Sequence, residues 1–184
     1  MSDNYHHGNL RQALIRAASD LVRTGHIDDF SLRGIARELG VSPAAAYHHF
    51  ADKSSLLNAV IRETGLELNR RLVSATTPTP PAGDQAMALG LAYIDFAIAE
   101  PALFTQMTST ACAEAEDIQA MSLELVKTAI ANDARGAELS TEELQDRVWS
   151  SWAISHGFAT LALAGRLTPE QARSAFIRQC HPDS

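Results

Sequence analysis

The chain has 184 residues, of which 46% are apolar and 20% are charged. This composition provides enough Leu, Ile, Val and Ala for a buried core, so it excludes a chain that is disordered throughout. No run of about 18 apolar residues free of charge occurs, which excludes a membrane-spanning helix and a membrane partner. The first ten residues lack the apolar run of a secretory signal, and we expect a cytoplasmic protein whose two cysteines, Cys112 and Cys180, are reduced.

The formal net charge of −7 is unevenly distributed along the chain. Residues 1–71 carry 9 basic and 8 acidic residues, whereas residues 72–184 carry 6 and 14. Five of the seven histidines also lie in the first part. An acidic body attached to a near-neutral, His-rich N-terminal part indicates that only the latter approaches a polyanion such as DNA.

Apolar residues recur at spacings of three and four, so the chain is predicted to be all-α. Asn9 with Gln12 forms a plausible cap pair that opens a first helix, and Gly25 stands where a C-terminal capping glycine is expected. Ser31 caps a short second helix, which ends at Gly40.

The third predicted helix begins at Ser42-Pro43, an N-cap followed by proline at the first helical position, and ends near Phe50. Asp52 caps a long fourth helix, and the proline-rich residues 76–83 are predicted to be a linker. Beyond the linker, capping boxes at 140–143 and 168–171 mark two of the later helices. The helices predicted there are 84–99, a short one from Pro101, 114–134, 141–164 and 168–179.

The second and third helices, separated by residues 40–42, form a candidate helix-turn-helix. At about 100° per residue, Ala46 and Phe50 point into the small core, whereas Ala44 and His48 point the opposite way. Tyr47 flanks that outward face, where its hydroxyl suits a DNA phosphate. Lys53 adds a cation beside the free N–H groups at the start of the fourth helix, which favours a phosphate there as well.

Residues 10–57 resemble the DNA-binding domain of TetR-family transcriptional regulators. The matching residues are 32–42 (LRGIARELGVS), 46–50 (AYHHF) and 52–57 (DKSSLL), and the opening residues 5–11 (YHHGNLR) resemble the start of many members. The resemblance implies an all-α homodimer on double-stranded operator DNA, with a C-terminal domain that binds a small-molecule effector. The function expected is a repressor that this unknown effector releases from its operator.

The domain organisation expected from this resemblance has three parts, which are a helix-turn-helix domain in residues 1–51, a connecting helix in 52–75 and an effector-binding and dimerisation domain in 84–184. Arg33 stands where members of the family often contact DNA. Pro43, Ala44 and Ala45 would face the base edges, but their side chains form no hydrogen bonds, so we expect sparse base readout. The DNA-binding residues predicted are Arg33, Ser42, Pro43, Ala44, Ala45, Tyr47, His48 and Lys53.

The C-terminal half resembles one group of these regulators through residues 152–157 (WAISHG), which match a W-x-x-x-H-G element. Residues 101–104 (PALF), followed by Met107, resemble the same group. The last two helices are expected to form a four-helix interface with a second copy. The effector-binding residues predicted are Tyr93, Phe96, Phe104, Met107, Met121, Trp152 and His156, for each of which ordinary core packing is the alternative.

Two other functions compete with this one. A ligand-binding helical dimer that has lost DNA binding remains the alternative, because the recognition helix is rich in alanine. An enzyme is not expected, since Ser151, Ser155 and His156 offer no nucleophile–base set and no phosphate loop, cofactor motif or metal motif is present. His6 and His7 are interpreted as a DNA-contacting arm or a disordered end.

Overall fold

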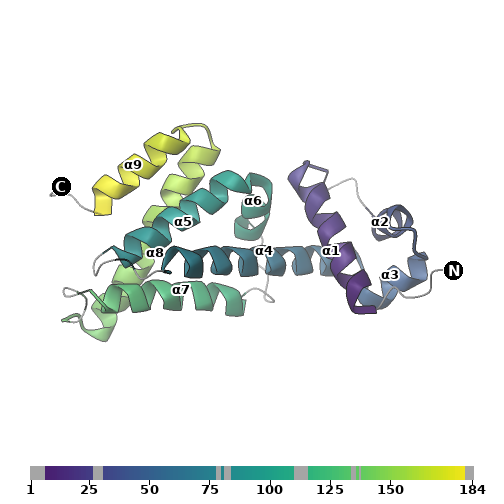
Figure 1. Ribbon diagram of the computed structural model, residues 1–184, viewed down its shortest axis with the longest axis horizontal. Coiled ribbons are helices and arrows are strands. Elements are labelled where there is room, and N and C mark those ends of the chain that lie inside the picture. Colours follow the sequence, from purple (N-terminus) through teal and green to yellow (C-terminus); the bar gives the residue numbers. More distant parts are fainter. Residues whose placement is uncertain are drawn as a thin grey trace. The chain divides into compact units, whose positions relative to one another are not determined.

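The computed structural model describes residues 7–26, 31–77, 80, 84–109, 116–133, 136 and 138–180. Over these ranges the chain is helical and contains no strand, which confirms the all-α prediction (Figure 1). The helices are α1 (His7–Arg23), α2 (Leu32–Glu38), α3 (Pro43–His49), α4 (Lys53–Ala75), α5 (Gln85–Ala99), α6 (Pro101–Ser109), α7 (Glu116–Ala131), α8 (Thr141–Leu163) and α9 (Pro169–Cys180).

The described residues divide into two compact units. The first contains those of residues 1–64 and 102–115, and the second contains those of 65–101 and 116–184. No single described helix has the length and apolar composition to cross a membrane, and α5 and α6 meet that test only when they are taken together as a broken pair.

The core of the first unit is formed by the apolar stripes of α1, α2, α3 and the start of α4. Leu14, Ala46 and Leu56 are fully buried in it, and Phe50 is almost so. The inward orientation predicted for Ala46 and Phe50 is therefore confirmed. The start predicted for the first helix is wrong, because α1 begins at His7 and includes Asn9 as a helical residue.

The turn between α2 and α3 is closed by backbone hydrogen bonds at Gly40, whose φ is 69°. The Val41 N–H donates to the Ala36 carbonyl at 2.9 Å, and the Gly40 N–H donates to the Arg37 carbonyl at 3.1 Å. This pattern requires a left-handed residue, which glycine adopts without strain. Ser42 then caps α3 by accepting from the Ala45 N–H at 3.2 Å. The predicted helix-turn-helix is thus present.

The second unit is organised around α5, with α8 and α9 packed against it (Figure 1). Gly90 permits this contact, because a Cβ there would overlap Cζ of Phe176 and lie 2.9 Å from Oγ of Ser155. Phe176 and Ala172 are consequently buried inside the unit. The capping boxes predicted at residues 140–143 and 168–171 both form.

Hydrogen bonds of the buried Asn69 side chain join the second-unit part of α4 to α7. The Asn69 side chain, 5% exposed, donates from Nδ2 to the Ile118 carbonyl at 3.1 Å. The Ser122 hydroxyl donates to Oδ1 of Asn69 at 3.0 Å. A Cβ on Gly65 would lie 3.0 Å from Cγ2 of Ile118, so the two helices approach closely beside these bonds.

Candidate functional site

The outward face of α3 carries the residues predicted for DNA contact. Pro43, Ala44 and His48 are exposed, and Tyr47 keeps 47% of its surface accessible. Ala45 is half-buried beside them. The face therefore presents two polar tips on a surface of methyl and ring carbons, which suits contacts to the sugar-phosphate backbone better than base readout.

Two polar residues beside that face, His49 and Ser42, make contacts within the protein. His49 is half-buried, and its ring meets that of His48 edge to face at 5.5 Å between centroids. Ser42 accepts a hydrogen bond from the α3 backbone through its hydroxyl, and its role as an N-cap is clear.

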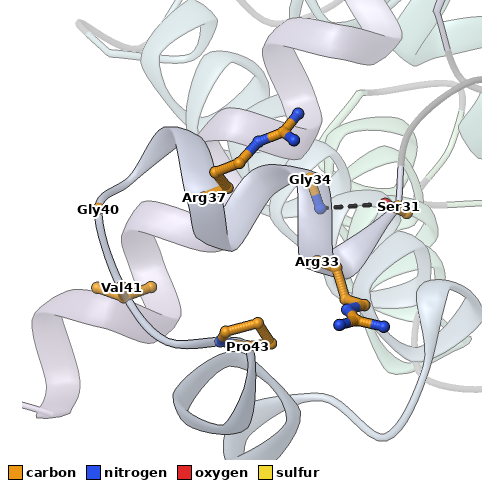
Figure 2. A pocket seen from close by; sticks show the side chains of 7 residues that line it. All are labelled: Ser31, Arg33, Gly34, Arg37, Gly40, Val41 and Pro43. Carbon is orange, nitrogen blue, oxygen red and sulfur yellow. Dashed lines mark hydrogen bonds between the residues drawn. The ribbon is translucent and has the colours of Figure 1, made fainter.

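A groove of about 570 Å³ lies between α2 and α3, and Figure 2 shows the residues that line it. Arg33 and Arg37 both border it, and their side chains extend from α2 in different directions. Ser31 holds the start of α2 by accepting from the Gly34 N–H at 3.0 Å. The prediction missed Arg37, although its position one turn after Arg33 was a usable signal.

Lys53 stands half-buried at the first position of α4. The preceding Asp52 caps this helix, and its carboxylate accepts from the Ser55 N–H at 2.7 Å. One of the N–H groups expected to be free for a phosphate is thus already bound. The lysine side chain supplies the positive charge at this helix start, and the two arginines of α2 are exposed elsewhere in the same unit.

Three of the seven residues predicted for effector binding come together in the second unit. The Tyr93 hydroxyl lies 3.0 Å from Nδ1 of His156, and the Trp152 ring stacks on the imidazole at 5.2 Å between centroids. Burial lowers the pKa of His156 and raises that of Tyr93, because both charged forms lose solvation. This cluster is neutral at physiological pH and joins α5 to α8.

The other four predicted residues have different surroundings. Phe96 is buried, with the Arg71 guanidinium 5.0 Å from its ring centroid. Phe104 is buried and Met107 half-buried on α6, in the part that belongs to the first unit. Met121 is 54% exposed on α7, and its role in effector binding stays a prediction.

A recess of about 230 Å³ lies elsewhere in the second unit, and no sequence pattern pointed to it. Residues from α5, α7, α8 and α9 line it, among them Met87, Ile130, Arg147 and Phe176. Its lining residues lie far apart in the sequence, which is why periodicity could not bring them together. Within the described part of the chain, no group of three potential metal-ligating residues is close enough to hold an ion. His6 and Cys112 fall outside the described residues.

Comparisons with known proteins match both parts of the chain. Residues 14–60 match the model for bacterial regulatory proteins of the tetR family, and residues 86–181 match the tetracyclin repressor-like C-terminal domain. A curated relative, the HTH-type transcriptional regulator BetI of Pectobacterium carotovorum, is 38% identical over 84 residues. The BetI of Brucella canis is 39% identical over 72 residues.

The chain spans less than half of these curated relatives, 43% of the first and 36% of the second, and the matches cover 44% and 37% of this chain. Two solved structures resemble nearly the whole fold. A protein of unknown function from Rhodococcus sp. RHA1 has a TM-score of 0.83 and 28% identity, with 98% of both chains covered. A TetR/AcrR regulator from Thermobifida fusca has a TM-score of 0.74 and 18% identity, with 94% of this chain and 96% of that chain covered. The families and curated relatives are regulators, which confirms that the chain is not an enzyme.

Proposed function

The chain belongs to the TetR family of bacterial regulatory proteins, and on that premise we propose that it binds double-stranded operator DNA and represses transcription. The observation that carries the proposal is the α2–turn–α3 unit, in which a rigid Gly40 turn presents the outer face of α3 beside two exposed arginines. Such a unit places its second helix in the major groove. A repressor of chromosomal genes acts in the cytoplasm.

Backbone contacts would dominate this binding. Tyr47, His48 and Lys53 are proposed to contact phosphates, which fix the position of the protein on the duplex without reading its sequence. Ala44 and Ala45 offer only methyl groups, which are best matched to thymine. Arg33 is the proposed source of hydrogen-bonded base readout, because a guanidinium can bind guanine through two donors.

A homodimer through α8 and α9 is proposed from the apolar surface that these helices leave uncovered. Trp149 is 46% and Leu161 44% exposed, and Ile177 on α9 is also exposed. Ala153 lies exposed between Trp149 and Gly157 on α8. A row of small and aromatic residues on a long helix suits close packing against a second copy of itself.

Release from DNA is proposed to follow from effector binding in the second unit. A dimer binds two half-sites about 34–36 Å apart, so a state with another spacing of the helix-turn-helix units binds poorly. The effector must favour that state by a difference in affinity between two dimer states. The continuous helix α4 connects the two units covalently and is the element through which such a preference would act.

The proposed function is tested by incubating the purified chain with a pool of randomised duplexes and sequencing the bound fraction. A palindromic site with half-sites one helical turn apart is expected. If no sequence is enriched and affinity for bulk duplex is negligible at low salt, the chain is instead a ligand-binding helical dimer without DNA binding.

A further inference from the structure

The recess between α5, α7, α8 and α9 combines an apolar floor with one basic residue, Arg147, and one acidic residue, Asp133. Met87, Ile130 and Phe176 form its apolar part, and Ile154 extends that surface. Phe176 is held in place from two sides, because its ring meets Phe158 edge to face at 6.1 Å and its tip lies over Gly90. The floor therefore cannot collapse into the recess without disturbing the packing of α9 on α5.

Within the described part of the second unit, several basic residues form ion pairs with a neighbouring carboxylate, and Arg147 is not one of them. Arg70 and Arg71 are held by Glu67, Lys127 by Glu124, and Arg173 by Asp95. The natural helical partner of Arg147 is Glu143, four residues earlier. That carboxylate is instead held by the N–H of Ser140 at 2.8 Å and its hydroxyl at 2.7 Å, as part of the capping box of α8.

We propose that this recess binds a small organic acid with one negative charge, whose carboxylate pairs with Arg147 and whose apolar body covers Met87, Ile130 and Phe176. Ser150, Ser151 and Gln179 also line the recess and supply neutral hydrogen-bonding groups. Asp133 shares the lining, so a second negative charge on the ligand would be repelled. The volume of about 230 Å³ lies below that of drug-sized pockets, about 300–1,000 Å³, which selects a small ligand.

The inference rests on the proposed function in one respect, since it identifies this acid as the effector of the regulator. The recess is lined by α8 and α9, the helices that carry the proposed dimer face. A ligand that fills it would change the preferred packing of those helices and thereby the population of the two dimer states.

Octanoate is the probe that we would use, with octan-1-ol as its uncharged match. Calorimetry on the full chain without DNA is expected to show binding of octanoate that is at least about fivefold tighter than that of octanol, and that weakens with salt. Arg147→Gln should remove this difference. Arg166→Gln, which removes the same charge from an exposed residue outside the recess, should leave it unchanged.

The position of the ligand is tested through Cys180, which lines the recess. In a Cys112→Ser chain, octanoate should slow the reaction of Cys180 with a maleimide, and Arg147→Gln should abolish that protection. Equal affinity for octanoate and octanol, no binding of either, or binding without protection of Cys180 would each overturn the proposal. Binding of octanoate by a chain that fails to select any duplex would leave the ligand site standing and refute only the DNA-binding function.

Discussion

The Tyr93 hydroxyl and Nδ1 of His156 lie 3.0 Å apart across the contact between α5 and α8. The imidazole is covered on one face by Trp152, with an angle of 13° between the ring planes. Trp149 meets Trp152 edge to face at 6.1 Å and is itself largely exposed. A chain of ring contacts thus runs from the buried Tyr93 on α5 through His156 and Trp152 on α8 to the exposed Trp149.

The first prediction concerns pH. Because burial lowers the pKa of His156, the unfolded chain binds a proton at this residue before the folded chain does. Stability is therefore unaffected above the unfolded value of about 6.5 and is lost as the pH falls through it. We expect the Tm of the wild type to fall more than that of His156→Gln between about pH 7.5 and about pH 5.5. An equal fall in Tm for the two chains across this range would contradict a neutral, half-buried imidazole.

The second prediction concerns phosphate contacts. Lys53→Ala should weaken binding to all duplexes to a similar degree and reduce the slope of log affinity against log salt by about one unit. Tyr47→Phe should also weaken all duplexes similarly, without a change in salt slope, since no charge is lost. Fluorescence anisotropy on a selected and a scrambled duplex measures both effects. Unchanged affinity for both variants would refute the proposed orientation of α3.

The third prediction separates Arg33 from the alanines of α3. Arg33→Ala should relax sequence preference at one position in each half-site, at a cost of about 1–3 kcal/mol for the preferred base. Ala44→Gly should alter that preference little. Randomised-site selection on both variants provides the comparison. If Ala44→Gly loses its sequence preference and Arg33→Ala keeps it, the bases are read through the alanine methyl group and not through the arginine.

The fourth prediction concerns the dimer. Ala153→Glu introduces a charge in the middle of the exposed apolar row on α8, where pairing with a second copy would bury it without a partner. Sedimentation should show that the variant is a monomer. Its Tm should stay close to that of the wild type, and its affinity for the selected duplex should fall. A wild type that is monomeric at micromolar concentration would disprove the interface.

The fifth prediction reverses the usual effect of replacing a helical glycine. Gly90→Ala would normally stabilise a helix by about 1 kcal/mol, but here the new methyl group overlaps Phe176. We expect a net loss of about 1–3 kcal/mol in the free energy of unfolding. Phe176→Leu shortens the obstructing side chain, so the double variant should lose less than the sum of the two single losses. If the losses of the two single variants simply add in the double variant, the new methyl group at residue 90 does not act through Phe176.

Much of this fold could be predicted because its boundaries are set by local hydrogen bonds. Ser31, Ser42 and Gly40 act within a few residues of their own positions, and the sequence displays that chemistry directly. The start of α1 was misjudged because the residues before Asn9 also adopt helical geometry, which overrides its preference for a cap.

The second unit was harder to predict because its features depend on which helix faces meet. Met121 shares an apolar pattern with buried neighbours but lies on the open side of α7. Phe176 follows the apolar spacing of α9, and only the contact with Gly90 shows that it packs inside the unit. The recess around Arg147 requires four helices to be placed in three dimensions, and the sequence records none of those distances.

The bonds that join Asn69 to α7 also restrict how α4 can move. A helix that slid by one residue along its axis would rise about 1.5 Å and turn its side chains by about 100°, which would carry the amide away from the Ile118 carbonyl and leave both groups buried without a partner. Axial sliding of α4 against α7 is therefore opposed. A tilt of α7 together with the second-unit part of α4 keeps these bonds intact, so we expect these two segments to move together.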